Sequence, residues 1–254
     1  MKIITSVKGG EGSGFRGHAG IPGHQGGSQA RSSVSIKLSS LEDLPNTPIA
    51  FDDWFKPGGY IHDLFDATYD GEHIAKLYEG MFDSYRSIPA KHFLRLKSIT
   101  TTPPSGYVQL QETPDAWTTT RIPEGEVQSI GVYNHDGTIH MHPSCSTLAD
   151  VFVHELGHHW TLGKTFGTGA SIVDTYLPNI FAAIDTIRRM KDPVYEIGVY
   201  CKNMTKNAKE FCAEIYEAMH NDMFRSSDSR LMLQDYLDRF ELLPMLKYMN
   251  IPGF

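Results

Sequence analysis

One stretch of this chain, VFVHELGHHW at residues 151–160, constrains its fold more than any other. It places His154 and His158 four residues apart, with Glu155 directly after the first histidine. On an α-helix, residues four apart share a face and their Cβ atoms lie roughly 6 Å apart, so one metal ion could bind both imidazoles. The stretch therefore predicts a metal-binding helix, around which the rest of the chain has to fold.

Flanking residues predict where this helix begins and ends. Thr147, with Asp150 three residues later, forms a predicted capping box that would start the helix. The apolar pattern then runs to about Leu162, and the glycine that follows is a stop signal. The neighbouring His159 points about 100° away from His158, so we expect it to pack against the protein rather than bind a metal.

The chemistry that fits these residues is that of a catalytic zinc ion. Zinc prefers imidazole ligands, and a catalytic site has three protein ligands and a water. Glu155 would be the general base, because its carboxylate can take a proton from that water and pass it to the leaving amine. The metzincin continuation HExxHxxGxxH is excluded, since Thr161 and Lys164 replace its glycine and third histidine. The third ligand must therefore come from elsewhere in the chain.

Three parts of the chain offer a third ligand. The segment NAKEFCAEIYEAM carries Glu210 and Glu214 one turn apart on a half-buried helix, and such an acidic pair suits a ligand with a supporting carboxylate. Asp174 in GTGASIVDTY is a rival, because aspartate also binds zinc. His140 and His142 share one face of a predicted strand and could bind metal themselves, although we favour solvated positions near the cleft.

Taken together, the two motifs resemble a known family. HELGH followed about fifty residues later by E-F-x-A-E is similar to the lethal-factor-like gluzincin peptidases, which include toxin catalytic domains and many phage-encoded relatives. The resemblance covers about residues 94–219 and implies Zn2+ as the cofactor, Glu210 as the third ligand and Glu214 as its support. Members often have an oxyanion-stabilising tyrosine seven residues before the ligand glutamate. That position here is Asn203, and Tyr200 is the nearest candidate for this catalytic role.

The N-terminal part differs in composition from the rest. Residues 9–28, GGEGSGFRGHAGIPGHQGGS, are nearly half glycine and lack apolar periodicity, so they cannot bury enough surface to offset the entropy of ordering. They resemble a glycine-rich segment, GSGxxGHxGxPGxxGGS, found in structural and maturation proteins of tailed phages and prophages. We expect residues 1–45 to be a flexible Gly/Ser-rich segment and residues 46–254 to be a zincin-like metallopeptidase domain.

The expected fold is α+β and zincin-like: a small mixed sheet with an edge hairpin packs on the metal-binding helix, and a mainly helical part follows. Asp136 and Gly137 predict the tight turn of the hairpin. In zincin folds the strand before the metal-binding helix lies at the sheet edge. A protein or peptide substrate is therefore expected along residues 131–142, which begin at Gly131 and end at His142. Apolar spacing also predicts helices at residues 71–86, 178–190, 208–220 and 231–243 and a strand at residues 93–99.

Composition excludes some partners. The net charge of -7 and the absence of a dense Lys/Arg run predict neither nucleic-acid nor membrane binding, and 40% hydrophobic residues suffice for a core. Three cysteines indicate a reducing compartment rather than a disulfide framework. The opening MKIITSVKGG is too short an apolar run for a signal peptide. We expect a cytoplasmic protein in the producing host cell, with association with a phage virion as a further expectation.

These features predict a zinc-dependent metalloendopeptidase that hydrolyses peptide bonds. A second enzyme class is the group of phage-associated peptidases that cleave repressors, which also carry HELGHH-like helices but place the ligand glutamate closer. A non-enzymatic alternative is a phage structural or head-associated protein with a binding-only or degenerate zincin domain. An intact Glu155 argues against degeneracy, because a binding-only domain has no need of the base.

Overall fold

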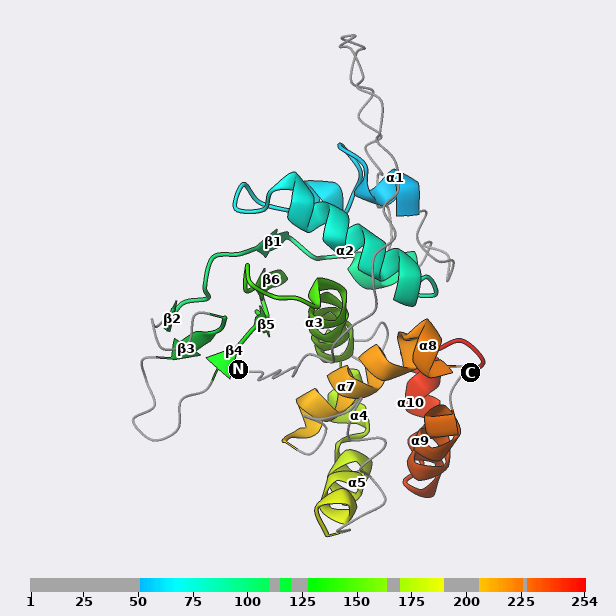
Figure 1. Ribbon diagram of the computed structural model, residues 1–254. Coiled ribbons are helices and arrows are strands. Elements are labelled where there is room, and N and C mark those ends of the chain that lie inside the picture. The colour runs from blue at the N-terminus through cyan, green and yellow to red at the C-terminus, as the bar shows by residue number, and fades with distance from the viewer. Residues whose placement is uncertain (1–50, 110–114, 120–127, 164–169, 190–205, 226–227) are drawn as a thin grey trace.

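The computed structural model describes residues 51–109, 115–119, 128–163, 170–189, 206–225 and 228–254. The expected segment 1–45 and its boundary at residue 46 lie outside these ranges. The described residues form an α+β fold in which a central helix, α3 (Leu148–Leu162), contacts two helices and two strands, namely α2 (Gly71–Ser84), α7 (Ala208–His220), β5 (Gly131–Tyr133) and β6 (Thr138–Met141) (Figure 1). This arrangement puts the HELGH stretch in the middle of the molecule.

Helices make up most of the described structure, and three of the four further helices predicted from apolar spacing appear within one or two residues of their expected limits. The fourth, at residues 231–243, is instead two helices, because Glu241 takes a left-handed φ of 56° between them. The helices are α1 Phe51–Phe55, α2 Gly71–Ser84, α3 Leu148–Leu162, α4 Ile172–Thr175, α5 Leu177–Arg189, α7 Ala208–His220, α8 Asp222–Arg225, α9 Asp228–Arg239 and α10 Leu243–Tyr248, with 3-10 turns η2 His62–Leu64 and η3 Ala90–Phe93.

Helix α3 is buried on nearly every side. Twelve of its fifteen residues are buried, as expected for a helix enclosed by other elements. It ends before Gly163, as predicted, but the predicted capping box at its start is wrong: the Thr147 side chain makes no capping hydrogen bond. Asp150 instead accepts a 2.6 Å hydrogen bond from the Tyr85 hydroxyl, so α2 and its C-cap hold this end of α3.

The sheet beside α3 has the strand order β1-β6-β5. The predicted hairpin is present: β5 Gly131–Tyr133 pairs antiparallel with β6 Thr138–Met141 across a turn in which Gly137 has a φ of 97°. β1 Ser98–Thr100 pairs parallel with β6 on the other side. β6 is therefore the middle strand, and the expectation that the strand directly before the metal-binding helix lies at the edge is wrong. Only the β5 half of the hairpin is an edge.

The open edge of β5 presents backbone groups. The His142 N–H donates to the Ile130 carbonyl at 2.7 Å, and the Asn134 N–H donates to the Thr138 carbonyl at 2.9 Å. Because inward and outward groups alternate along an antiparallel ladder, the N–H and C=O of Gly131 and Tyr133 point away from β6. No other strand among the described residues pairs with them.

Two features of the sheets were not predicted. A second antiparallel sheet consists of β2 Tyr107–Gln109, β3 Trp117–Thr119 and β4 Gln128–Ser129, and its buried Trp117 packs edge-on against His142, with ring centroids 5.3 Å apart. The predicted strand at residues 93–99 is mostly absent, because the chain makes the η3 turn after Pro89 and extends only at β1. Of its apolar residues, Phe93 is buried from the η3 turn and Ile99 from β1.

One hydrophobic core runs through the described residues, from Phe51 in α1 to Ile251 after α10. The helices that come after α3 in the chain lie on the side of α3 that faces away from the β1-β6-β5 sheet (Figure 1). Within the described ranges, no helix is both long and apolar enough to cross a membrane.

Candidate metal centre

Helices α3 and α7 touch where Gly157 meets Ala213. A Cβ at Gly157 would lie 3.1 Å from Tyr216 Cδ1 and 3.2 Å from both the Cα and the carbonyl oxygen of Ala213. The glycine of HELGH therefore lets the two backbones approach closely. Because Glu210 lies one turn before Ala213, this approach brings its short side chain within reach of α3.

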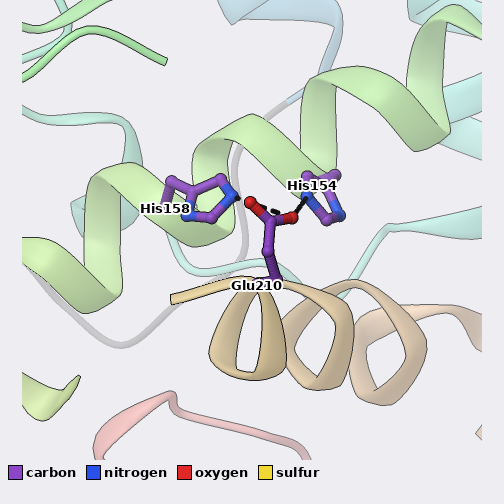
Figure 2. Close-up of side chains that lie close together, drawn as sticks. All are labelled: His154, His158 and Glu210. Atoms are coloured by element: carbon purple, nitrogen blue, oxygen red, sulfur yellow. Dashed lines mark ion pairs between the residues drawn. The ribbon is translucent and has the colours of Figure 1, made fainter. Parts of the chain in front are cut away.

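Three side chains converge at this crossing. Figure 2 shows His154 and His158 projecting from α3 toward α7, with the Glu210 carboxylate between them. Glu210 Oε2 lies 3.4 Å from His154 Nε2 and 3.9 Å from His158 Nε2. Each of the three residues offers a ligand atom within 4.8 Å of the others, and all three side chains are buried.

The ligand atoms of this group lack other partners. Nε2 of both histidines and both carboxylate oxygens of Glu210 are buried without a hydrogen bond to any described residue. Such unpaired atoms are costly in a protein interior and call for an explanation. Two imidazole nitrogens and one carboxylate oxygen are the donor set of a catalytic zinc site that keeps a position open for water. The residues therefore fit a zinc ion.

Electrostatics differ between the two histidines. Burial opposes the charge on His154, but the carboxylates of Glu210 and Glu217 hold the pKa of His154 well above its usual range. Burial lowers the pKa of His158 well below its usual range, and the neighbouring His154 adds to that shift. In the metal-free protein His158 is therefore neutral, which is the form that binds a metal, whereas His154 would release a proton on binding one.

Glu155 lies beside the three converging side chains, and its own carboxylate is buried. Burial raises the pKa of Glu155 to about 8, which His154 opposes and Glu210 reinforces. Its side chain occupies the space in front of β5: a Cβ at Gly131 would lie 2.6 Å from Glu155 Oε1. The absence of a side chain at Gly131 therefore leaves room for this carboxylate next to the open strand edge.

The predicted supporting residue Glu214 is close, but another carboxylate is closer. Glu214 Oε1 lies 3.8 Å from His154 Nδ1, whereas Glu217 Oε2 lies 3.1 Å from the same nitrogen. Sequence reasoning passed over Glu217 because it is two turns away from Glu210. The sequence nevertheless contained a signal for Glu217, because it lies seven residues after Glu210 and residues seven apart share a helix face.

The rival ligands have other contacts. Asp174 belongs to a capping box of α4: its Oδ2 accepts from the Ser171 hydroxyl at 2.7 Å, and its N–H donates to Ser171 Oγ at 3.0 Å. The ring nitrogens of His140 lie 2.6 Å from the Thr102 carbonyl oxygen and 2.8 Å from Asn134 Nδ2. Neither joins a group of potential ligands among the described residues.

Of the remaining predicted residues, His142 and His159 belong to the described part of the chain and Tyr200 does not. His142 is buried rather than solvated, and its Nδ1 accepts from the Ser144 N–H at 3.1 Å. His159 packs as expected, with Nε2 2.7 Å from the Leu94 carbonyl oxygen and Nδ1 3.2 Å from the Tyr133 hydroxyl. Tyr200, the candidate for stabilising the oxyanion, lies outside the described residues.

Comparison with known proteins adds no relative: no protein-family model, curated protein or solved structure matches the chain. The two motifs that resemble those of gluzincins lie on α3 and α7.

Proposed function

We propose that this protein is a zinc-dependent metalloendopeptidase with a zincin-like fold, in which His154, His158 and Glu210 hold the metal. The observation that carries the proposal is the convergence of their buried ligand atoms, which have no other hydrogen-bond partner among the described residues. A structural histidine pair would be hydrogen-bonded, as His159 is.

Glu155 would act as general base. A zinc ion in this site would polarise a water molecule and lower its pKa toward neutrality. The Glu155 carboxylate can accept a proton from the attacking water and deliver it to the amine that leaves. Burial raises the pKa of Glu155 in the metal-free protein, and the positive charge of a bound zinc ion would lower it and keep the carboxylate ionised, as a general base requires.

The β5 edge would bind the peptide. The outward N–H and C=O of Gly131 and the C=O of Tyr133 can pair with an extended chain, as an added strand does, while the Tyr133 N–H faces the Glu155 carboxylate. A peptide in that position passes directly by Glu155, because the Cα of Gly131 abuts that side chain. The closeness of the edge strand to Glu155 supports this proposal.

Metal content and hydrolysis test the proposal together. The purified protein should hold about one zinc ion, and His154→Ala or His158→Ala should each lose most of it. Glu155→Gln should keep zinc and fold while hydrolysis of a quenched-fluorescence peptide library falls by about 10²- to 10⁴-fold. Glu72→Gln, an exposed carboxylate on α2 paired with Lys76, is the matched control and should change neither.

Two outcomes separate the alternatives. A wild-type protein that refuses zinc contradicts the metal site itself. A wild-type protein that holds zinc yet cleaves no peptide in the library supports the binding-only domain of a phage head-associated protein. The glycine-rich sequence of residues 9–28 motivates that alternative, but no side chain of the site favours it, since Glu155 is present and buried.

A further inference from the structure

The two ring nitrogens of His154 face different carboxylates. Nε2 lies 3.4 Å from Glu210 Oε2 on the side of His158. Nδ1 lies 3.1 Å from Glu217 Oε2 and 3.8 Å from Glu214 Oε1. All three carboxylates come from α7, at positions i, i+4 and i+7, so a single helix face surrounds the imidazole.

Only one of the two carboxylates near Nδ1 is within hydrogen-bond distance. If Nε2 binds the metal, the ring carries its proton on Nδ1 and can donate it to one acceptor. A separation of 3.1 Å allows that bond, whereas 3.8 Å does not. We propose that Glu217, rather than Glu214, is the positioning residue that orients His154 for metal binding. The inference rests on the proposed zinc site and deepens it.

The surroundings of Glu217 support this role. Asp150, four residues before His154 on α3, accepts its hydrogen bond from Tyr85 and not from the histidine. Asn221 in turn donates to the Tyr85 hydroxyl at 3.2 Å, which ties the end of α7 to the same place. The last turn of α7 is thereby held against α3, and Glu217 is held facing Nδ1.

A second metal site is the alternative role for these side chains, because His154, Glu214 and Glu217 also offer ligand atoms within 4.8 Å of one another. His154 belongs to both groups, however. A neutral imidazole that binds one ion through Nε2 has a proton, not a lone pair, on Nδ1. The arrangement of His154, Glu214 and Glu217 therefore suits a hydrogen bond from His154 Nδ1 to the Glu217 carboxylate better than it suits a second metal ion.

A positioning residue acts through the histidine without touching the ion. Loss of such a partner typically weakens metal binding by about 10- to 100-fold, because the ring loses its orientation and some of its basicity. Glu217→Ala should fall in that range, and Glu217→Gln should lose less, since an amide oxygen still accepts a hydrogen bond. Glu214→Gln should lose less than either Glu217 variant.

The experiment measures zinc affinity of the full chain by competition with a chromophoric chelator, with Glu72→Gln as the control. The visible spectrum of the cobalt-substituted protein provides a second readout, because it reports ligand geometry. Glu217→Ala should shift this spectrum, whereas Glu214→Gln should leave it in place. Unfolding in urea with chelator present checks that the metal-free variants remain folded. The near-isosteric Glu217→Gln carries the test if the alanine variant does not fold.

Failure of this inference is distinguishable from failure of the proposed function. A wild-type chain that binds no zinc overturns both. If wild type binds zinc and the Glu217 variants match it, or if Glu214→Gln loses more affinity than they do, the assignment of Glu217 alone is overturned. Two zinc ions per chain, with one lost on substitution of Glu217, would make it a ligand instead and would also overturn the inference.

Discussion

At the scale of single residues, Gly131 limits where Glu155 can lie. A Cβ at this position would come 2.6 Å from Glu155 Oε1 and equally close to Val151 Cγ1. Contacts below 3 Å are not tolerated, so a neighbour would have to move. The carboxylate is the far end of a flexible side chain and would move first. Gly131 thus sets the position of the proposed base without any side chain of its own.

Gly131→Ala should therefore fold and bind zinc like wild type but hydrolyse peptides at least about tenfold more slowly, since small misplacements of a reacting group are costly. The double variant Gly131→Ala/Val151→Ala removes the contact with Val151 and keeps the one with Glu155. Peptide hydrolysis and zinc content of both variants are measured. Full recovery of activity in the double variant would mean that packing strain, not displacement of Glu155, caused the loss.

Sequence reasoning reached the metal-binding residues but not all of their surroundings. His154 and His158 follow from helical spacing alone, because a four-residue step puts them on one face wherever the helix packs. Choosing between Glu214 and Glu217 requires the angle at which α7 crosses α3, and no local pattern encodes that angle. The resemblance implied Glu214, and the distances place Glu217 nearer the histidine.

At the scale of elements, the site depends on the crossing of α3 and α7. Gly157 and Ala213 permit a backbone approach that no larger pair would allow. A similar crossing exists between α2 and α3, where a Cβ at Gly80 would lie 2.7 Å from Ala149 Cβ. These two glycines make a matched pair: each lies where another helix packs closely on α3, but only Gly157 faces α7, the helix that carries Glu210.

Gly157→Val and Gly80→Val should each destabilise the fold by about 1–3 kcal/mol, because both force added atoms into a close contact. Only Gly157→Val should also weaken zinc binding of the folded protein, since it moves α7 away from the histidines. Urea unfolding midpoints and chelator competition measure the two effects separately. Equal zinc affinities in the two variants would show that the crossing does not set the ligand geometry.

Helices were predicted better than sheets for a physical reason. The 3.6-residue period of α2, α5 and α7 is visible within a dozen residues, so their limits follow from local sequence. The strands here are two to four residues long, which is too short for an alternation to be distinguished from chance. Whether β6 is central or at an edge depends on β1, whose residues pair with β6 residues 40 positions later in the chain.

At the scale of the whole molecule, His92 joins distant parts of the chain. Its Nδ1 lies 2.6 Å from the Tyr216 hydroxyl on α7, and its Nε2 lies 3.0 Å from Asn250 Oδ1, after α10. Its ring stacks on Trp160 of α3 with centroids 4.0 Å apart. His220 lies edge-on to it and contacts the Met249 carbonyl oxygen. The C-terminal residues are thus fastened to both helices of the proposed site.

Stability should fall in acid partly because of His92. Burial, with smaller effects from His220 and Lys91, lowers the pKa of His92 well below its ordinary 6.5, while Asn250 opposes the shift. The unfolded chain therefore takes up this proton first as the pH drops below about 6.5, which favours unfolding. The free energy of unfolding should fall by roughly 1 kcal/mol because of this group between neutral pH and pH 5.5.

Urea unfolding of wild type and His92→Gln, with a chelator present, measures the effect. The variant should be less stable at neutral pH but should lose roughly 1 kcal/mol less than wild type on acidification. His142 and His159, whose pKa values burial also lowers, remain in both proteins and cancel in the comparison. Parallel losses in the two proteins would assign the acid sensitivity to other groups.

The stacking of His92 on Trp160 also makes the molecule its own optical probe. The stacked His92 stays neutral in the folded protein, and the indole N–H of Trp160 donates to the Tyr248 carbonyl at 3.1 Å, so the emission of Trp160 depends on whether the C-terminal residues are in place. The chain has three tryptophans, so replacing Trp54 and Trp117 with phenylalanine would leave Trp160 as the only emitter. Its fluorescence intensity would then report, in real time and without a label, when the C-terminal residues move away from α3 and α7, the two helices that carry the proposed zinc ligands.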